Sequence, residues 1–185
     1  MLPEISLNVL DIAQNSIRAE ASCIEICIDV DQSKDTLAVT IKDDGCGMTQ
    51  EQIAQVTDPF FTTRTTRKIG LGIPFFRMAA LITGGSFEIE SEVSKGTIVK
   101  AGFVLSHIDR MPLGDINSTI HTLVTYNTNI DFVYTYIFNG KSFTLDTREM
   151  REVLGGVPFD EPEVSTYIKE YLSENKNETD GGALI

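Results

Sequence analysis

The sequence predicts an α/β fold, a two-layer sandwich with a small C-terminal α+β appendage. Apolar residues recur every three to four positions over residues 5–19 and 73–82, which is typical of amphipathic helices. In four other segments apolar and polar residues alternate, as in half-buried strands. These segments are residues 23–30, 36–41, 86–91 and 97–105. The order of helices and strands favours two packed layers.

The first helical segment, residues 5–19, has one apolar and one polar side. At about 3.6 residues per turn, its polar side carries Asn8, Asp11, Asn15 and Arg18. Side chains four residues apart on a helix lie next to each other. We therefore expect these polar groups to form one continuous stripe.

Short signals define the rest of the first domain. Thr49-x-x-Gln52 is a capping pattern for a short helix over residues 49–56. Residues 58–69 form a polar, threonine-rich connection that is long for a compact domain. The helix over residues 73–82 ends at a pair of glycines.

The composition changes after the first domain, which we place at residues 1–106. Residues 107–175 are expected to form an accessory segment of helix, two strands and two helices. Its strands are joined by Asn139-Gly140, a strong signal for a type I′ hairpin turn. Residues 176–185 are polar and glycine-rich, and we expect them to be disordered.

Composition and charge limit the function classes. The chain has 185 residues, 42% of them hydrophobic, which is typical of a soluble globular protein. No apolar run approaches the roughly 20 residues of a membrane span, and the N-terminus lacks the features of a secretory signal. The three cysteines, Cys23, Cys27 and Cys46, are too few for a disulfide framework, so we expect a reducing, cytoplasmic location. The net charge of −12 argues against a nucleic-acid surface.

Asp11 and Asn15 are the first residues that indicate chemistry. They lie four positions apart on one helix face, so both side chains can reach one point. The amide oxygen can ligate Mg²⁺, and the carboxylate can orient or deprotonate a nucleophile. An ordinary solvated helix face is the alternative interpretation.

Two glycine loops allow a ligand to approach the backbone closely. In Asp43-Asp-Gly45-Cys-Gly47, the glycines permit positive φ and the first carboxylate can accept a hydrogen bond. A tight acidic turn is the alternative, since the spacing of a calcium loop is absent. Gly70-Leu-Gly72 precedes a helix and could present N–H groups to phosphates, although such a pair is often only a turn.

Five ordered motifs resemble those of the GHKL superfamily, which includes histidine kinases, the mismatch-repair ATPase, the Hsp90 chaperones and type II topoisomerases. Asp11-x-x-x-Asn-Ser-Ile-Arg18 is similar to the N box, Asp43-Asp-Gly-Cys-Gly-Met48 to the G1 box and Gly70-Leu-Gly-Ile73 to the G2 box. Asp58-Pro-Phe-Phe-Thr-Thr-Arg64 resembles the F box of histidine kinases, and Thr83 to Thr97 resembles the usual end of the kinase domain.

The resemblance implies the Bergerat ATP-binding fold and a pocket for an adenine nucleotide. It implies that Asn15 ligates Mg²⁺, that Asp43 accepts a hydrogen bond from the adenine amino group and that Asp11 is catalytic. Residues 58–69 are then a lid that orders when nucleotide binds. The other residues that it assigns to ATP binding are Arg18, Gly45, Gly47, Met48, Phe60, Thr63, Arg64, Lys68, Gly70, Leu71, Gly72 and Thr97.

The chain departs from the family pattern in two ways. Hydrolysing relatives have glutamate at the position of Asp11, and histidine kinases usually have asparagine. A carboxylate there favours activation of water or of a hydroxyl. Only ten residues precede Asp11, which leaves no room for a two-helix dimerisation hairpin, so we do not expect a complete sensor kinase.

Two further residues have an open interpretation. Ser106-His107 begins a segment similar to the phosphoacceptor box of histidine kinases, but it follows the ATP domain and lacks the acidic residue beside the histidine. A linker is the interpretation that we favour. Cys46 lies in the predicted adenine loop, where oxidation could block nucleotide entry.

The expected function is therefore that of an Mg-ATP-binding protein that hydrolyses ATP or transfers its γ-phosphate to a partner protein. No nucleic acid is expected as a ligand, and a homodimer is compatible with the sequence. The competing class is a non-catalytic nucleotide sensor whose lid controls the binding of a partner.

Overall fold

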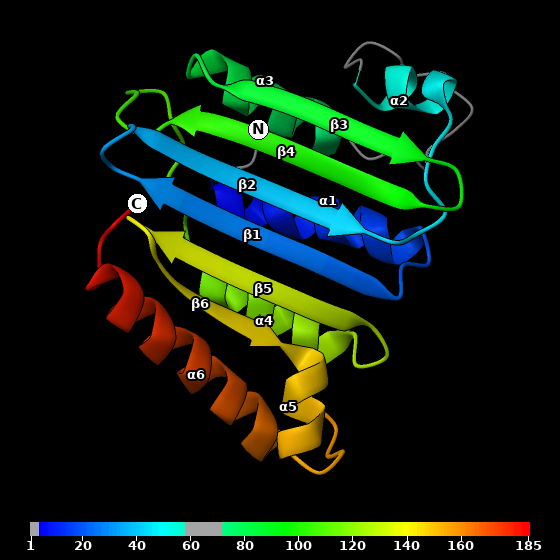
Figure 1. Ribbon diagram of the computed structural model, residues 1–185, viewed down its shortest axis with the longest axis vertical. Helices are drawn as coiled ribbons and strands as arrows, with labels where there is room; N and C mark the ends of the chain where they lie inside the picture. Colours follow the sequence, from blue (N-terminus) through cyan, green and yellow to red (C-terminus); the bar gives the residue numbers. More distant parts are fainter. Residues whose placement is uncertain (1–3, 58–71) are drawn as a thin grey trace.

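A six-stranded sheet with the strand order β3-β4-β2-β1-β5-β6 forms the centre of the molecule (Figure 1). The computed structural model describes residues 4–57 and 72–185. The strands are β1 (Cys23–Asp31), β2 (Thr36–Asp43), β3 (Ser86–Glu92), β4 (Gly96–Val104), β5 (Asp131–Phe138) and β6 (Lys141–Asp146). Neighbouring strands are antiparallel except for β1 and β5, which are parallel.

Helices cover one face of this sheet. They are α1 (Ile5–Arg18), α2 (Gln50–Thr57), α3 (Gly72–Ile82), α4 (Ile116–Tyr126), α5 (Thr147–Val153) and α6 (Pro162–Asp180). Figure 1 shows α1, α3 and α4 behind the sheet, and α6 packs against both α4 and β6.

The alternation of β1 explains the position of the core. Ile24, Ile26, Ile28 and Val30 point to the helical face, and each is at most 2% exposed. Burial of such a side chain contributes about 1.5–3 kcal/mol. The residues between them belong to the opposite face, where Glu25 and Asp29 are exposed.

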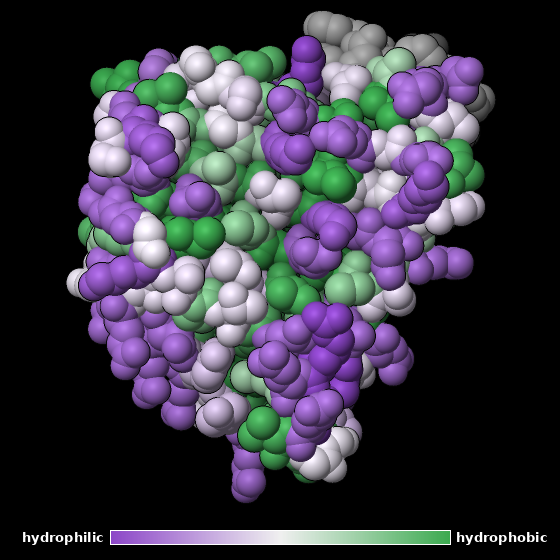
Figure 2. All heavy atoms as spheres, viewed as in Figure 1, coloured by the Kyte–Doolittle hydropathy of each residue, from purple (hydrophilic) through white to green (hydrophobic). Residues whose placement is uncertain are grey.

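The opposite face of the sheet is polar at its rim. Lys42 of β2 and Glu25 of β1 form an ion pair across the two strands at 2.8 Å. Figure 2 shows this face, on which hydrophilic side chains surround paler and apolar ones. No helix of the described ranges lies over it, so the predicted two-layer α/β sandwich is confirmed.

Two local predictions are confirmed in detail. The Thr49 N–H donates to Gln52 Oε1 at 2.8 Å, and the Gln52 N–H donates to Thr49 Oγ1 at 3.3 Å, so α2 begins with a capping box. Asn139 and Gly140 both have positive φ, 49° and 84°, as a type I′ turn between β5 and β6 requires.

Asn8 does not lie on the polar side of α1, where the periodicity placed it. It is 1% exposed, and its Nδ2 donates to the Glu4 carbonyl oxygen at 3.0 Å. This local acceptor satisfies the amide group, so the side chain can be buried at little cost.

The accessory segment extends the sheet of the first domain. Strand β5 pairs with β1 over its whole length, with Phe132 opposite Ile24. Residues 107–175 therefore share one sheet with residues 1–106, and the division between them stays a prediction.

The predicted disorder of residues 176–185 is wrong. Helix α6 continues to Asp180, whose side chain is fully buried. The Asp180 carboxylate accepts hydrogen bonds from Tyr136 Oη at 2.9 Å, from Lys176 Nζ at 2.5 Å and from the Gly182 N–H at 2.9 Å. The local composition gave no sign of the bond to Tyr136, because this residue comes from the distant strand β5.

Within the two ranges that the structure describes, none of the helices has both the length and the apolar character that crossing a membrane requires.

Candidate functional site

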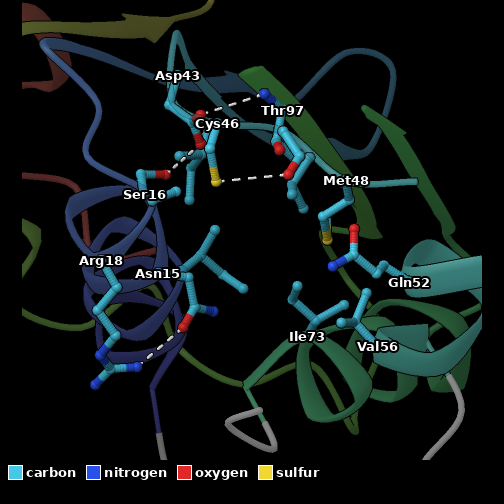
Figure 3. A pocket seen from close by; sticks show the side chains of 15 residues that line it. Asn15, Ser16, Arg18, Asp43, Cys46, Met48, Gln52, Val56, Ile73 and Thr97 are labelled. Carbon is cyan, nitrogen blue, oxygen red and sulfur yellow. Dashed lines mark hydrogen bonds between the residues drawn. The ribbon is translucent and has the colours of Figure 1, made fainter. Parts of the chain in front are cut away.

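A cavity of about 260 Å³ opens between α1, α2, the first turn of α3 and the ends of β2 and β4 (Figure 3). Six of the predicted site residues line it. They are Asn15, Arg18, Asp43, Gly47, Met48 and Thr97. Residues that are distant in the sequence thus meet where the motif order predicted a pocket.

Asp43 is the most strongly fixed group of the cavity. It ends β2 and is only 8% exposed. Its Oδ2 accepts from Ser16 Oγ at 2.5 Å, and its Oδ1 accepts from the N–H groups of Gly45 at 2.9 Å and Thr97 at 3.2 Å. A carboxylate offers about four acceptor positions. It therefore keeps capacity for one more donor, which a ligand in the cavity can supply.

Ser16 is a site residue that the sequence reasoning missed. It is 3% exposed and joins α1 to the end of β2 through its bond to Asp43. The signal that could have revealed it is a hydroxyl on the buried side of α1, beside Ile12 and Ala13.

The loop after Asp43 is held against the turn between β3 and β4. Gly47 has φ +66°, and a Cβ on it would lie 1.9 Å from the Glu92 carbonyl oxygen. The Met48 N–H donates to Ser91 Oγ at 2.8 Å, and this hydroxyl also lies 2.8 Å from Thr97 Oγ1. Only glycine fits at position 47, so the loop can follow the cavity wall closely.

A second carboxylate fixes the outer side of the same loop. Asp44 accepts hydrogen bonds from the N–H groups of Ser22 and Cys23 at 2.8 and 2.9 Å, and from Ser22 Oγ at 2.5 Å. Partial burial raises the pKa of Asp44, but these donors outweigh it and hold the pKa below its usual value. The loop is thus tied to the start of β1.

Asn15 and Arg18 form the helix side of the cavity. Arg18 Nη1 donates to Asn15 Oδ1 at 3.1 Å, as the dashed line in Figure 3 marks. Asn15 is half-buried and Arg18 is exposed. The guanidinium therefore faces solvent beside the amide that was predicted to ligate Mg²⁺.

The remaining walls are mainly apolar, with Gln52 as a polar exception. Ile12, Ile41, Val56, Ile73 and Val99 line the cavity. With Met48, they provide surface that suits a flat, weakly polar ring. The sequence reasoning did not name these five residues, because an apolar wall residue cannot be told from a core residue by its type.

Other predicted residues lie elsewhere. Gly45 donates to Asp43 behind the wall, and Asp11 contacts Gly72 one helical turn before Asn15. The predictions for Phe60, Thr63, Arg64, Lys68, Gly70 and Leu71 lie outside the described residues. Over residues 4–57 and 72–185, no three His, Cys, Asp or Glu side chains are grouped so that they could hold a metal ion.

His107 lies far from the cavity. Thr97 lines the cavity at the start of β4, and His107 follows the other end of that strand. At about 3.3 Å per residue, the length of the strand separates them by more than about 20 Å. The Asp109 N–H donates to His107 Nδ1 at 3.1 Å, which fits the linker interpretation.

The cysteines differ in their surroundings. Cys23 and Cys27 are half-buried, and burial raises the pKa of both thiols. Cys46 is exposed and lines the cavity (Figure 3). The prediction that its oxidation blocks the cavity stays open.

Residues 4–107 match the family of histidine kinase-, DNA gyrase B- and HSP90-like ATPases. The match covers more than half of the chain, and the chain belongs to this family. The GHKL resemblance of the motifs is thereby confirmed, and membership supports ATP binding by this domain.

Similar proteins include two bacterial signalling proteins. Sporulation kinase C of Bacillus subtilis is 30% identical over 97 residues, which cover 52% of this chain and 22% of that protein. The sensor protein SrrB of Staphylococcus aureus is 33% identical over 101 residues, which cover 52% of this chain and 17% of that protein. The chain therefore spans less than a quarter of the length of these relatives.

A solved structure supports the fold. The N-terminal domain of a DNA repair protein superimposes with a TM-score of 0.56 at 15% identity, covering 78% of this chain and 53% of that one. At this identity the similarity shows the α/β sandwich of the Bergerat type and nothing of the activity.

Proposed function

We propose that the chain binds Mg-ATP in the Asp43 cavity and hydrolyses it or transfers its γ-phosphate to a partner protein. The observation that carries the proposal is the Asp43 carboxylate, held by three donors with one acceptor position free and facing Asn15 across a mainly apolar cavity. The reducing cytoplasm, where ATP is abundant, is the compartment that we propose.

The adenine end of the ligand fits the Asp43 side of the cavity. The adenine amino group supplies the donor that the carboxylate can still accept. Ile41, Val99 and Met48 offer apolar contact to the purine ring. Gly45, Gly47 and Thr97 support this arrangement by fixing the carboxylate and the loop.

The phosphate end fits the side of Asn15 and Arg18. The Asn15 amide oxygen is a hard ligand of the kind that Mg²⁺ prefers, and Mg²⁺ usually takes few protein ligands together with phosphate oxygens and water. When bound, Mg²⁺ neutralises phosphate charge. Arg18 adds a cation from the described part of the chain, and we propose the same role for Arg64 and Lys68.

Further phosphate contacts are proposed for the segment that precedes α3. Gly70, Leu71 and Gly72 would present backbone N–H groups to the phosphates at the start of this helix. Phe60 and Thr63 are proposed to belong to the lid that closes over the nucleotide.

Asp11 is proposed as the catalytic base. It lies one helical turn before Asn15 on α1, so its carboxylate can accept the proton of a water or hydroxyl that attacks the γ-phosphorus while the bond to the β-phosphate oxygen breaks. Such bases contribute typically about 10²–10⁴-fold to the rate. The competing function is a nucleotide sensor, in which Asp11 has no chemical role.

Two matched variants separate these functions. Asp43→Asn should weaken Mg-ATP binding at least about tenfold in calorimetry, because its NH₂ group cannot accept from adenine or from Ser16. Asp11→Asn should retain binding and lose phosphate release about 100-fold or more. Asp29→Asn, on the opposite face of the sheet, is the control.

The binding and turnover measurements test the site, the catalytic base and the sensor function separately. If Mg-ATP neither binds nor raises the melting temperature, the proposed site is wrong. If Asp11→Asn binds Mg-ATP and turns it over as well as the unmodified chain does, Asp11 is not the base. If nucleotide binds but neither phosphate release nor labelled partner appears, the sensor function holds.

A further inference from the structure

A second cavity, of about 470 Å³, lies between α1 and α4 on the helical side of the molecule. We call it the α1–α4 groove. The residues that line it are Leu10, Gln14, Ile17 and Arg18 from α1, and Thr122, Leu123, Tyr126 and Asn127 from α4 and its C-terminal end. The two helices pack directly against each other along this groove.

The groove has an apolar floor and an aromatic rim. Leu123 is 1% exposed and forms part of the core, while Leu10 and Ile17 are partly buried and pack on that core. Tyr126 is 80% exposed, which is unusual for an aromatic side chain of this size. Gln14, Thr122 and Asn127 add polar groups around the apolar floor. An apolar floor with a polar rim and an exposed aromatic side chain is typical of a surface that receives an amphipathic helix.

Among the described residues that line the groove, only Arg18 has a side chain that is charged at neutral pH. The chain as a whole carries a net charge of −12, but charges beyond about 8 Å are largely screened at physiological ionic strength. The local cation therefore decides which charge the groove prefers. A carboxylate beside apolar side chains complements it.

We propose that the α1–α4 groove binds a short amphipathic segment of a partner protein that carries acidic side chains beside its apolar face. From Leu10 to Arg18 the groove is about 12 Å long, so it receives two to three turns of such a helix.

Arg18 also connects the groove with the nucleotide cavity. It lines both cavities, and its Nη1 donates to Asn15 Oδ1 at 3.1 Å. An acidic segment in the groove competes with Asn15 and with phosphate for the guanidinium. This coupling, unlike the docking itself, rests on the proposed function. By linkage, the segment and Mg-ATP then weaken each other's binding by the same factor.

The test uses the full chain and two fluorescent peptides of about twelve residues. In both, Leu and Phe recur at helical spacing. One peptide carries Glu on the flanks of the apolar face and the other carries Gln there. Fluorescence anisotropy without nucleotide should show about threefold to fivefold tighter binding of the Glu peptide, the size of one solvent-exposed ion pair.

Variants then locate the binding. Arg18→Gln should reduce the ratio of the two affinities to about one, and Tyr126→Ala should weaken both peptides about tenfold. The control variants Arg77→Gln and Tyr167→Ala alter an exposed arginine of α3 and an exposed tyrosine of α6. They should change neither the ratio of the two peptide affinities nor the affinities themselves.

Three outcomes overturn the proposal. The first is that neither peptide shows saturable binding. The second is that Arg18→Gln still binds the Glu peptide more tightly than the Gln peptide, by the same ratio of affinities. The third is that sedimentation shows a dimer of the chain that Tyr126→Ala dissociates, because the groove then receives a second copy. Peptide binding that is unaffected by Mg-ATP overturns only the coupling. A chain that binds peptide but no ATP contradicts the proposed function and leaves the groove in place.

Discussion

The carboxylate of Asp11 lies directly against Gly72 at the start of α3. A Cβ on Gly72 would be 2.0 Å from Asp11 Oδ2 and 2.8 Å from Asp11 Cγ. Only glycine therefore leaves room for the carboxylate as it is placed. The N-terminus of a helix favours negative charge. The start of α3 therefore holds the Asp11 carboxylate in place between α1 and the segment that precedes α3.

Gly72→Ala should lower catalysis as a substitution of Asp11 would, although the Asp11 side chain is still present. The new methyl group displaces the carboxylate, and a shift of this size costs about 10²-fold where catalytic geometry is strict. The Asp11 side chain is only half-buried, so it can move aside, which limits the strain. Phosphate release should fall strongly while the melting temperature changes little.

Gly102→Ala is the matched control for this change. Its Cβ would lie 2.9 Å from the Ser86 hydroxyl, which is an exposed side chain that can move away. It should therefore leave turnover unchanged. If Gly72→Ala also turns over Mg-ATP normally, the placement of Asp11 against α3 has no role in the reaction.

Ser16→Ala should weaken adenine nucleotide binding. The variant removes the 2.5 Å bond to Asp43 Oδ2 and leaves a buried carboxylate with one donor fewer. Hydrogen bonds to charged groups contribute about 1.5–3 kcal/mol, so the affinity for ATP measured by calorimetry should fall about tenfold or more. The free energy of unfolding should fall by a similar amount.

The exposed pair of Ser118 and Asp115 offers the same chemistry away from the cavity, with Ser118 Oγ donating at 2.6 Å. Ser118→Ala should leave the ATP affinity unchanged. An unchanged affinity in Ser16→Ala as well would mean that Asp43 is held without the hydroxyl.

The sequence is sufficient for those features that depend on neighbours in the chain. The capping box of Thr49 and Gln52 and the turn at Asn139 are local, and both are present. The partner of Ser16 is Asp43, 27 residues away along the chain, and one partner of Asp180 is Tyr136, 44 residues away. A pattern of residue types holds no information on such pairs until the strands are placed, which is why Ser16 was missed and the tail was wrongly expected to be disordered.

His107→Ala should not change the incorporation of label from ATP into the chain. The histidine lies beyond the far end of β4 from the cavity, more than about 20 Å away along the strand. Its Nδ1 also accepts a backbone hydrogen bond. The measurement is autoradiography of the unmodified chain and the variant after incubation with γ-labelled ATP, with His121→Ala as the control. Label that disappears only in His107→Ala would identify a phosphoacceptor that acts between molecules.

The contacts of Asp180 should make the C-terminal end of the fold sensitive to acid. Burial alone raises the pKa of Asp180, but the hydrogen bonds from Lys176, Gly182 and Tyr136 outweigh it and lower the pKa below its usual value. In the unfolded chain the pKa of an aspartate is about 3.9. The ionised group therefore stabilises the folded state fully above that pH, and this contribution is lost as the pH falls through the lower pKa of the folded state.

Hydrogen exchange at the Gly182 amide measures this directly, because that N–H donates to Asp180 Oδ1 at 2.9 Å. Protection of the amide should be constant between about pH 5 and 7 after correction for intrinsic exchange, and should fall below about pH 4. Asp180→Asn should lower the protection at neutral pH and flatten its acid dependence, since the amide does not titrate and cannot pair with Lys176 as an ion. Asp160→Asn, at an exposed position, should leave the acid profile as it is. Protection in Asp180→Asn that still falls below pH 4 as in the unmodified chain would assign the acid sensitivity to another carboxylate.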